Sequence, residues 1–146
     1  MARSDFEFAW PFRVRYAEVD GQMIVFNAHY LTYFDTAITE YFRALPYDYR
    51  GQVTRTGEDF HTVRTLVEYQ QPIVFDEDIE VCLRTSRLGG SSLTFLLEIH
   101  PQGLDDLRAT GEVVWVNTDQ TTHKSAAVPA QLADKIRVHE GERLSG

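Results

Sequence analysis

Hydrophobic and polar positions follow two different periods along this chain. Near the N-terminus Phe12, Val14 and Tyr16 alternate with arginines. A period of two is typical of a half-buried strand and predicts one over about residues 8–19. Pro11 falls within this span and indicates that the strand starts at the edge of a sheet or is irregular there.

From residue 28 to residue 45 the period lengthens to that of a helix. Apolar and aromatic side chains cover most of its surface, and a narrow polar stripe runs from Thr32 to Arg43. Asn27 is a suitable N-cap, and Pro46 stops the helix. Because the apolar arc is wider than a surface helix needs, we expect a curved sheet to cover this helix.

The second half of the chain returns to the strand period. A loop is expected over residues 46–61, where Gly51 and Gly57 are turn signals. Four strand-like runs follow, over residues 63–69, 79–85, 93–99 and 109–116. The stretch from Val113 to Val116 is apolar on both faces, which favours a central strand.

Connections between these runs decide the expected fold class. They are short, so the four strands are expected to form a mostly antiparallel meander. A short helix is expected to begin at Pro129 and to carry Leu132 and Ile136. One sheet covering one very apolar helix gives an α+β architecture.

Composition narrows the class of protein. The 146 residues suit one domain over 1–146, with a polar, frayed tail over about 139–146. A net charge of −8 argues against nucleic-acid binding. No segment has the length of a membrane span or a signal peptide, so no membrane partner is expected. The single cysteine, Cys82, excludes an internal disulfide, fits a reducing cytoplasm and is expected to be a packed, inert thiol.

Two stretches resemble the hotdog-fold thioesterases of the 4-hydroxybenzoyl-CoA and acyl-CoA thioesterase type. The first is "VRYAEVDGQMIVFNAHYLTYFDTAITEYFRAL", similar to the family's strand, acid, loop and N-x-x-Y helix start. The second is "VEYQQPIVFDEDIEVCLRTSRLGGSSLTFLLEI", similar to the family's second to fourth strands, including its Y-x-x-P element. The resemblance implies a five-stranded antiparallel sheet wrapped around the helix. It also implies a homodimer with continuous sheets, often a homotetramer, and active sites between subunits.

The resemblance matches Asp20 to the family's catalytic acid. A carboxylate just ahead of a helix can attack a thioester carbonyl or activate water, and these two roles stay open. Backbone N–H groups of Val25 and Phe26 are expected to form the oxyanion site, with Asn27 orienting water or thioester. The plain alternatives are a solvated turn residue for Asp20 and an N-cap for Asn27. Glu18 is expected at the surface.

Other positions match substrate contacts of the family. Met23 stands where family members commonly have glycine. The substrate-binding candidates are Met23, Tyr30, Phe34 and His61, although the pattern favours core packing for Tyr30 and Phe34 and an exposed strand edge for His61. The CoA-binding candidates are Arg87, Gly89, Ser91 and Ser92, for which a hairpin turn is the structural alternative. Many relatives have arginine where this chain has Gly90.

The expected reaction is hydrolysis of an acyl-CoA or aryl-CoA thioester without cofactor or metal. The five histidines have no metal-ligand spacing, and no GxSxG or nucleotide motif is present. Two alternatives remain: a non-catalytic protein that binds acyl thioesters, and a thioesterase that acts on acyl carrier protein. The negative charge opposes the latter because a carrier protein is acidic.

Overall fold

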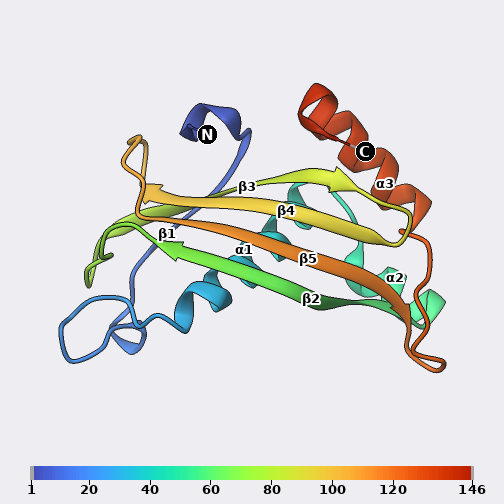
Figure 1. The fold of residues 1–146 in the computed structure, drawn as a ribbon, viewed down its shortest axis with the longest axis horizontal. Coiled ribbons are helices and arrows are strands. Elements are labelled where there is room, and N and C mark those ends of the chain that lie inside the picture. The colour runs from blue at the N-terminus through green and yellow to red at the C-terminus, as the bar shows by residue number, and fades with distance from the viewer. Residues whose placement is uncertain (1, 146) are drawn as a thin grey trace. The chain divides into compact units, whose positions relative to one another are not determined.

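A computed structural model describes residues 2–145 of the chain (Figure 1). Its helices and strands confirm the α+β class. In chain order they are β1 (Phe8–Arg13), α1 (His29–Ala44), α2 (Tyr49–Thr56), β2 (Glu58–Tyr69), β3 (Asp78–Leu88), β4 (Ser92–Pro101), β5 (Ala109–Asp119) and α3 (Ala130–Glu140), with 3-10 turns at Arg3–Asp5, Tyr16–Glu18 and Gly141–Arg143.

The five strands form one sheet in the order β1-β3-β4-β5-β2. Strand β1 pairs antiparallel with β3, with Pro11 opposite Glu80, and lies at the edge that the proline indicated. Strand β5 is interior, in keeping with its two apolar faces. The predicted four-strand meander is wrong for β2, which lies beside β5 rather than β3. The segment after β2 does not form a hairpin between β2 and β3. It is hydrogen-bonded to the loop before α1, where the Ile73 carbonyl accepts from the Val25 N–H.

The first strand ends earlier than its alternating pattern predicted. The Val14 N–H donates to the Glu77 carbonyl, outside the β1–β3 ladder. Residues Tyr16–Glu18 then form a 3-10 turn in which the Glu18 N–H donates to the Arg15 carbonyl. The strand therefore covers only Phe8–Arg13 of the predicted span.

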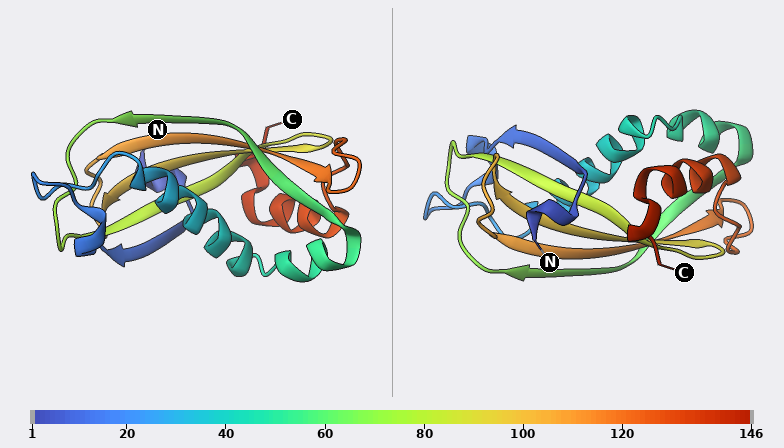
Figure 2. Two further views of the ribbon diagram at one scale, coloured as in Figure 1. Left: turned by 90° about the horizontal axis from the view of Figure 1, so that it is seen from below. Right: turned by 90° about the horizontal axis from the view of Figure 1, so that it is seen from above.

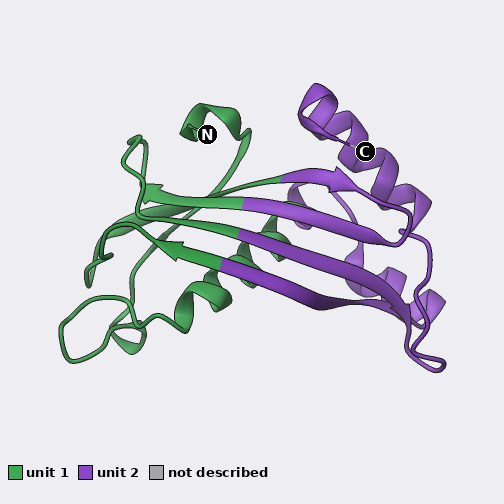
Figure 3. Cartoon of the chain, in the orientation of Figure 1, with its two compact units in different colours: residues 1–41, 67–84, 97–111 green, residues 42–66, 85–96, 112–146 purple. Residues whose placement is uncertain are grey.

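Two compact units make up the chain (Figure 3). Unit 1 includes residues up to Tyr41, 67–84 and 97–111; unit 2 includes residues 42–66, 85–96 and 112 onward. Strands β2 to β5 and helix α1 each contribute residues to both units. The candidate site described below lies within unit 1.

Helix α1 begins and ends within one residue of its predicted bounds. In unit 1 it lies along one face of the sheet (Figure 2), and Tyr33, Phe34 and Ile38 are fully buried. Gly111 on β5 allows this close approach, because a Cβ atom there would lie 2.4 Å from Cε2 of Phe34. In unit 2, Phe42 contacts Tyr47, Phe95 and Trp115, with ring centroids 5.8–6.2 Å apart.

Two segments predicted to be irregular are ordered. The predicted loop over residues 46–61 contains α2, which Asp48 caps by accepting from the Gly51 N–H and which ends at Gly57 with φ 69°. The cap residues of α2 therefore include Gly57, one of the predicted turn signals. In the predicted frayed tail, Ser145 donates through its N–H and its hydroxyl to the Ser86 carbonyl, and residue 146 lies outside the described residues. The predicted short helix is confirmed as α3.

Among residues 2–145, no helix combines the length and the apolar character needed to cross a bilayer.

Candidate active site in unit 1

Asp20 begins a tight turn that leads into the loop before α1. The Asp20 carbonyl accepts from the Met23 N–H, and the Asp20 N–H donates to the Ile24 carbonyl, both at 2.9 Å. Side-chain Oδ1 accepts from the Gln22 N–H at 2.8 Å, which fixes the carboxylate against its own turn. Within residues 2–145, the second carboxylate oxygen accepts no hydrogen bond. The carboxylate therefore has one oxygen held and one available.

Met23 occupies the position of this turn that favours glycine. These two backbone bonds close a tight turn that ends in a residue in the left-handed region. Met23 has φ 62°, and its side chain is 44% exposed. An L side chain in this conformation is strained, because Cβ crowds the following carbonyl. The backbone thus explains why glycine is common here in the family that the sequence resembles.

Hydrogen bonds correct the predicted oxyanion donors. The Val25 N–H donates to the Ile73 carbonyl at 2.8 Å, and the Phe26 N–H donates to the Glu18 carbonyl at 2.9 Å. Both groups are used by the fold and are not available to a substrate. In the described part of the chain, the N–H groups of Asn27 and Ala28 donate to no acceptor. They lie just ahead of α1, which begins at His29.

Glu18, expected at the surface, is a buried support of this loop. Its side chain accepts from the Arg15 N–H and Nε at 2.8 Å each and from the Tyr33 hydroxyl at 2.9 Å. Burial alone raises the pKa of Glu18, but these bonds outweigh burial and lower the pKa below its usual value. The pattern did not predict this, because the strand ends at Arg13 and Tyr33 approaches from another element.

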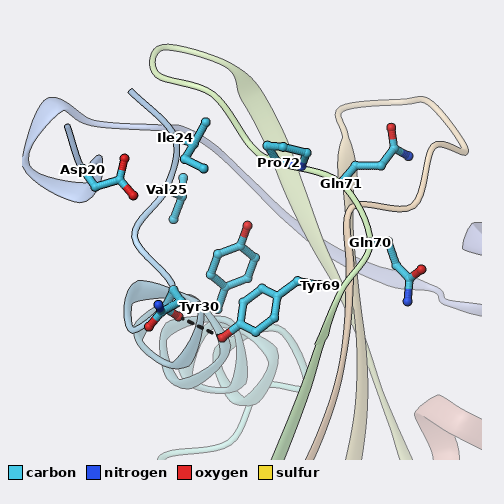
Figure 4. A pocket seen from close by; sticks show the side chains of 9 residues that line it. Asp20, Ile24, Val25, Tyr30, Tyr69, Gln70, Gln71 and Pro72 are labelled. Atoms are coloured by element: carbon cyan, nitrogen blue, oxygen red, sulfur yellow. Dashed lines mark hydrogen bonds between the residues drawn. The ribbon is translucent and has the colours of Figure 1, made fainter. Parts of the chain in front are cut away.

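A pocket of about 310 Å³ opens beside Asp20 (Figure 4). Its lining residues are Asp20, Ile24, Val25, Asn27, Tyr30, Tyr69, Gln70, Gln71 and Pro72. The Tyr30 and Tyr69 rings meet edge to face, with centroids 4.8 Å apart. Tyr69 donates its hydroxyl to the Asn27 carbonyl at 3.3 Å, joining the end of β2 to the residues before α1.

The hydroxyl of Tyr30 has no hydrogen-bond partner within residues 2–145. Tyr30 is 3% exposed, and its hydroxyl points toward the space between Val25 and Pro72 (Figure 4). Burial, followed by the neighbouring Tyr69, raises its pKa above the ordinary value, so the group stays a neutral donor. Because this hydroxyl lines the pocket and has no partner among these residues, it is free to bond a ligand there.

Three predicted substrate contacts lie outside the lining of this pocket. Met23 is exposed on the turn, and Phe34 is buried against Gly111. His61 is an exposed residue of β2 in unit 2, where its Nε2 lies 3.1 Å from Nε2 of Gln120. Of the predicted substrate contacts, only Tyr30 lines the pocket.

The predicted CoA-binding residues lie together at the β3–β4 turn in unit 2. The Gly89 N–H donates to the Ser92 carbonyl, which closes a hairpin. The Ser91 carbonyl accepts from Asn117, so part of the turn is used by the fold. Arg87 is exposed. The turn therefore forms the hairpin that was the structural alternative, and it also has the exposed cationic side chain of Arg87 beside it. CoA binding by these residues stays a prediction.

The pocket also contains residues that pattern analysis missed. Tyr69 and Pro72 belong to the quoted Y-x-x-P element, which was available as a signal. Gln70 and Gln71 carried no signal, because they line the pocket only through the course of the segment after β2.

Among the described residues, no group of three or more potential ligands is arranged for a metal ion. Cys82 is buried as predicted, and burial, followed by Glu80, raises its pKa to about 12.

Comparison with known proteins gives matches along most of the chain. A family model described as the thioesterase-like superfamily matches residues 14–136. The chain is 28% identical over 131 residues to acyl-CoA thioester hydrolase YbgC of Escherichia coli O6:H1, which covers 89% of this chain and 96% of that protein.

Solved structures agree with the fold. The PA5185 protein of Pseudomonas aeruginosa PAO1 superposes with a TM-score of 0.85 at 26% identity, over 97% of this chain and 96% of that chain. The SAV2348 protein of Staphylococcus aureus, solved in complex with CoA, gives a TM-score of 0.84 at 16% identity, over 95% and 86% of the two chains. The similarities confirm the hotdog fold that the sequence resemblance implied.

Proposed function

The chain belongs to the thioesterase-like superfamily, and from this membership we propose that it hydrolyses an acyl-CoA or aryl-CoA thioester to the free acid and CoA. The observation that carries the proposal is the pocket, where the Asp20 carboxylate meets free N–H groups ahead of α1. The name of its E. coli relative, an acyl-CoA thioester hydrolase, supports the choice of substrate class.

Asp20 is proposed as the catalytic carboxylate. Its free oxygen either attacks the thioester carbonyl or removes a proton from an attacking water. In the first course an acyl-aspartyl anhydride forms, the thiolate of CoA leaves, and water then releases the acid. In the second course water, losing a proton to Asp20, adds directly to the carbonyl, and the C–S bond then breaks to release the thiolate of CoA. The bond from Gln22 to Oδ1 holds the carboxylate in place for either course.

The N–H groups of Asn27 and Ala28 are proposed as the oxyanion donors, in place of those of Val25 and Phe26. Attack on the carbonyl places negative charge on its oxygen, and preorganised donors stabilise that charge. The positive end of the α1 dipole acts in the same direction. A side-chain role of Asn27 in orienting water remains part of the proposal.

Tyr30 and Tyr69 are proposed to contact the acyl part of the substrate. Their rings provide apolar walls, together with Ile24, Val25 and Pro72. The unpartnered Tyr30 hydroxyl supplies one donor inside this wall. Arg87 and the Gly89–Ser92 turn are proposed to bind CoA, because a guanidinium suits a phosphate.

A homodimer paired through β2 is proposed as the smallest active form. Strand β2 lies at the edge of the sheet, and residues 61–66 are all exposed in the single chain. A long exposed edge strand favours pairing with another strand. Tyr69, the last residue of β2, lines the pocket, so a partner paired along β2 would approach the site.

Turnover of a panel of CoA thioesters with short, long and aromatic acyl groups tests the function. Free thiol is followed as CoA is released. We expect hydrolysis of at least one member of the panel, with kcat in the range of about 1–1000 s⁻¹ that is common for enzymes. Binding of CoA thioesters without release of thiol would contradict the proposal and favour a binding protein. Release only from acyl carrier protein would contradict the proposed substrate.

A further inference from the structure

The segment between β2 and β3, residues 70–77, forms one wall of the pocket. Pro72 and Gln71 lie across the pocket from Asp20 (Figure 4). The same segment runs alongside the loop that carries Asp20. The Ile73 carbonyl accepts from the Val25 N–H at 2.8 Å, and the Phe75 N–H donates to the Met23 carbonyl at 3.0 Å. The Asp20 loop therefore takes its position from residues 70–77.

This segment is in turn held by Arg108, just ahead of β5. The guanidinium makes a two-pronged bond to Glu77, with Nη1–Oε1 at 2.9 Å and Nη2–Oε2 at 2.7 Å. Nη1 also donates to the Pro72 carbonyl at 3.0 Å. The Arg108 carbonyl accepts from the N–H groups of Gln70 and Gln71 at 2.9 and 3.1 Å. Arg108 thus contacts the segment at its start, through residues 70–72, and at its end, through Glu77.

Burial makes these contacts firmer than those of a surface ion pair. The side chains of Arg108 and Glu77 are 14% and 19% exposed. Partly buried, bidentate bonds between guanidinium and carboxylate are strong and geometrically specific. Glu77 also accepts from the Val74 N–H at 3.1 Å, which closes the turn around Asp76, a residue with φ 67°. The pair therefore fixes a strained turn as well as the ends of the segment.

We infer that Arg108 is a positioning residue for hydrolysis, acting through Glu77 and residues 70–77 on the geometry of the Asp20 loop. The inference rests on the proposed function. Arg108 does not line the pocket, and its effect is to hold the pocket wall and the loop in register. Small displacements of a reacting group lower kcat strongly, whereas they change the binding of the substrate little.

Arg108→Lys is the sharpest variant, because lysine keeps the charge but cannot form the two-pronged bond together with the Pro72 contact. Arg137→Lys is the matched control. Arg137 pairs with Asp134 at 3.2 Å on α3, and its side chain is 59% exposed. Glu77→Gln is the second variant, and it retains an oxygen that accepts from Arg108 and Val74. It covers the case in which Arg108→Lys does not fold.

Two readouts are measured on each variant. Hydrogen exchange at the Val25 and Phe75 amides reports the contact between the two loops, whether or not the protein is active. We expect exchange there to quicken at least about tenfold in Arg108→Lys and Glu77→Gln, and to stay unchanged in Arg137→Lys. Steady-state kinetics are expected to give a kcat about 10–100-fold lower, with KM changed less than about threefold.

Unchanged exchange at both amides would overturn the inference. The inference would also be overturned if a variant lost stability to urea but kept a kcat within about twofold of the wild type. Arg108 would then contribute to general stability and not to the geometry of the site. If the wild type hydrolyses no thioester, the proposed function fails, and the exchange data still decide whether Arg108 holds the two loops together.

Discussion

At the scale of single residues, the site depends on how the carboxylate of Asp20 is presented. One oxygen is bonded within the turn at 2.8 Å and the other is free. An aspartate at the start of a turn is common, so its position alone indicated structure rather than catalysis. What distinguishes Asp20 is the pocket beside it and the free N–H groups of Asn27 and Ala28 nearby in the chain.

Met23→Gly is predicted to raise the free energy of unfolding by about 1 kcal/mol. Glycine adopts the φ of 62° without strain, and the exposed methionine side chain loses little packing. Urea unfolding measures the change. Gly90→Ala, at a turn where an added Cβ has open space, serves as the control. A loss of stability in Met23→Gly would show that the methionine side chain contributes more than its strained backbone costs.

Glu18 is predicted to make stability depend on pH. Its pKa is lowered in the folded state. Its carboxylate therefore stabilises the fold above the unfolded pKa of about 4.3, and this contribution is lost as pH falls through the folded pKa. Urea unfolding between pH 7 and pH 3 is expected to show a steeper loss for the wild type than for Glu18→Gln. Parallel curves would contradict the prediction, and Asp134→Asn, at an exposed pair, is the control.

The resemblance singled out Asp20 and Tyr30, and both line one pocket, while a catalytic role of Asp20 stays a prediction. The supports of the Asp20 loop were not predicted, for a physical reason. The occupied amides of Val25 and Phe26 depend on Ile73 and Glu18 as acceptors. Such partners are set by tertiary contacts, which hydrophobic periodicity does not encode.

At the scale of elements, long periodic segments were predicted well and weakly apolar ones were not. Helix α1 and strands β3 to β5 have regular apolar faces, and their bounds were close to those observed. Helix α2 has no fully buried residue, so its sequence lacks the apolar stripe that would predict a helix. Its C-cap residue, Gly57, was interpreted as a turn signal. The end of β1 depended on the Glu77 carbonyl, far along the chain.

Gly111→Ala is predicted to reduce the free energy of unfolding by about 1–3 kcal/mol. The added Cβ would meet the Phe34 ring at 2.4 Å, and that ring is buried within unit 1 and has no room to move. Urea unfolding with the same Gly90→Ala control measures the cost. A change below about 0.5 kcal/mol would mean that α1 shifts away from β5 easily.

At the scale of the whole molecule, the sheet order left β2 at an edge with a run of exposed residues. Strand order was the least predictable feature of the fold. Short connections favoured a meander, whereas the segment after β2 is held by Arg108 and the Asp20 loop. The proposed dimer follows from this order, because only an edge strand has unpaired backbone groups to offer.

Lysines at Val63 and Leu66 are predicted to convert an oligomer into a monomer. Both residues are exposed in the single chain, at 59% and 41%. Charges on an edge strand oppose its pairing with a second copy. Light scattering after gel filtration gives the mass of the wild type and of the Val63→Lys, Leu66→Lys double variant. Val138→Lys, on exposed α3, is the control. A monomeric wild type would contradict pairing through β2.

The most direct test of the account is the kcat of Asp20→Asn on the best thioester of the panel. Asparagine keeps an oxygen that accepts from Gln22, so the turn and the stability to urea are expected to remain. Loss of the carboxylate is predicted to lower kcat about 100–10,000-fold. A folded Asp20→Asn variant with kcat within about threefold of the wild type would contradict the assignment of Asp20 as the catalytic residue.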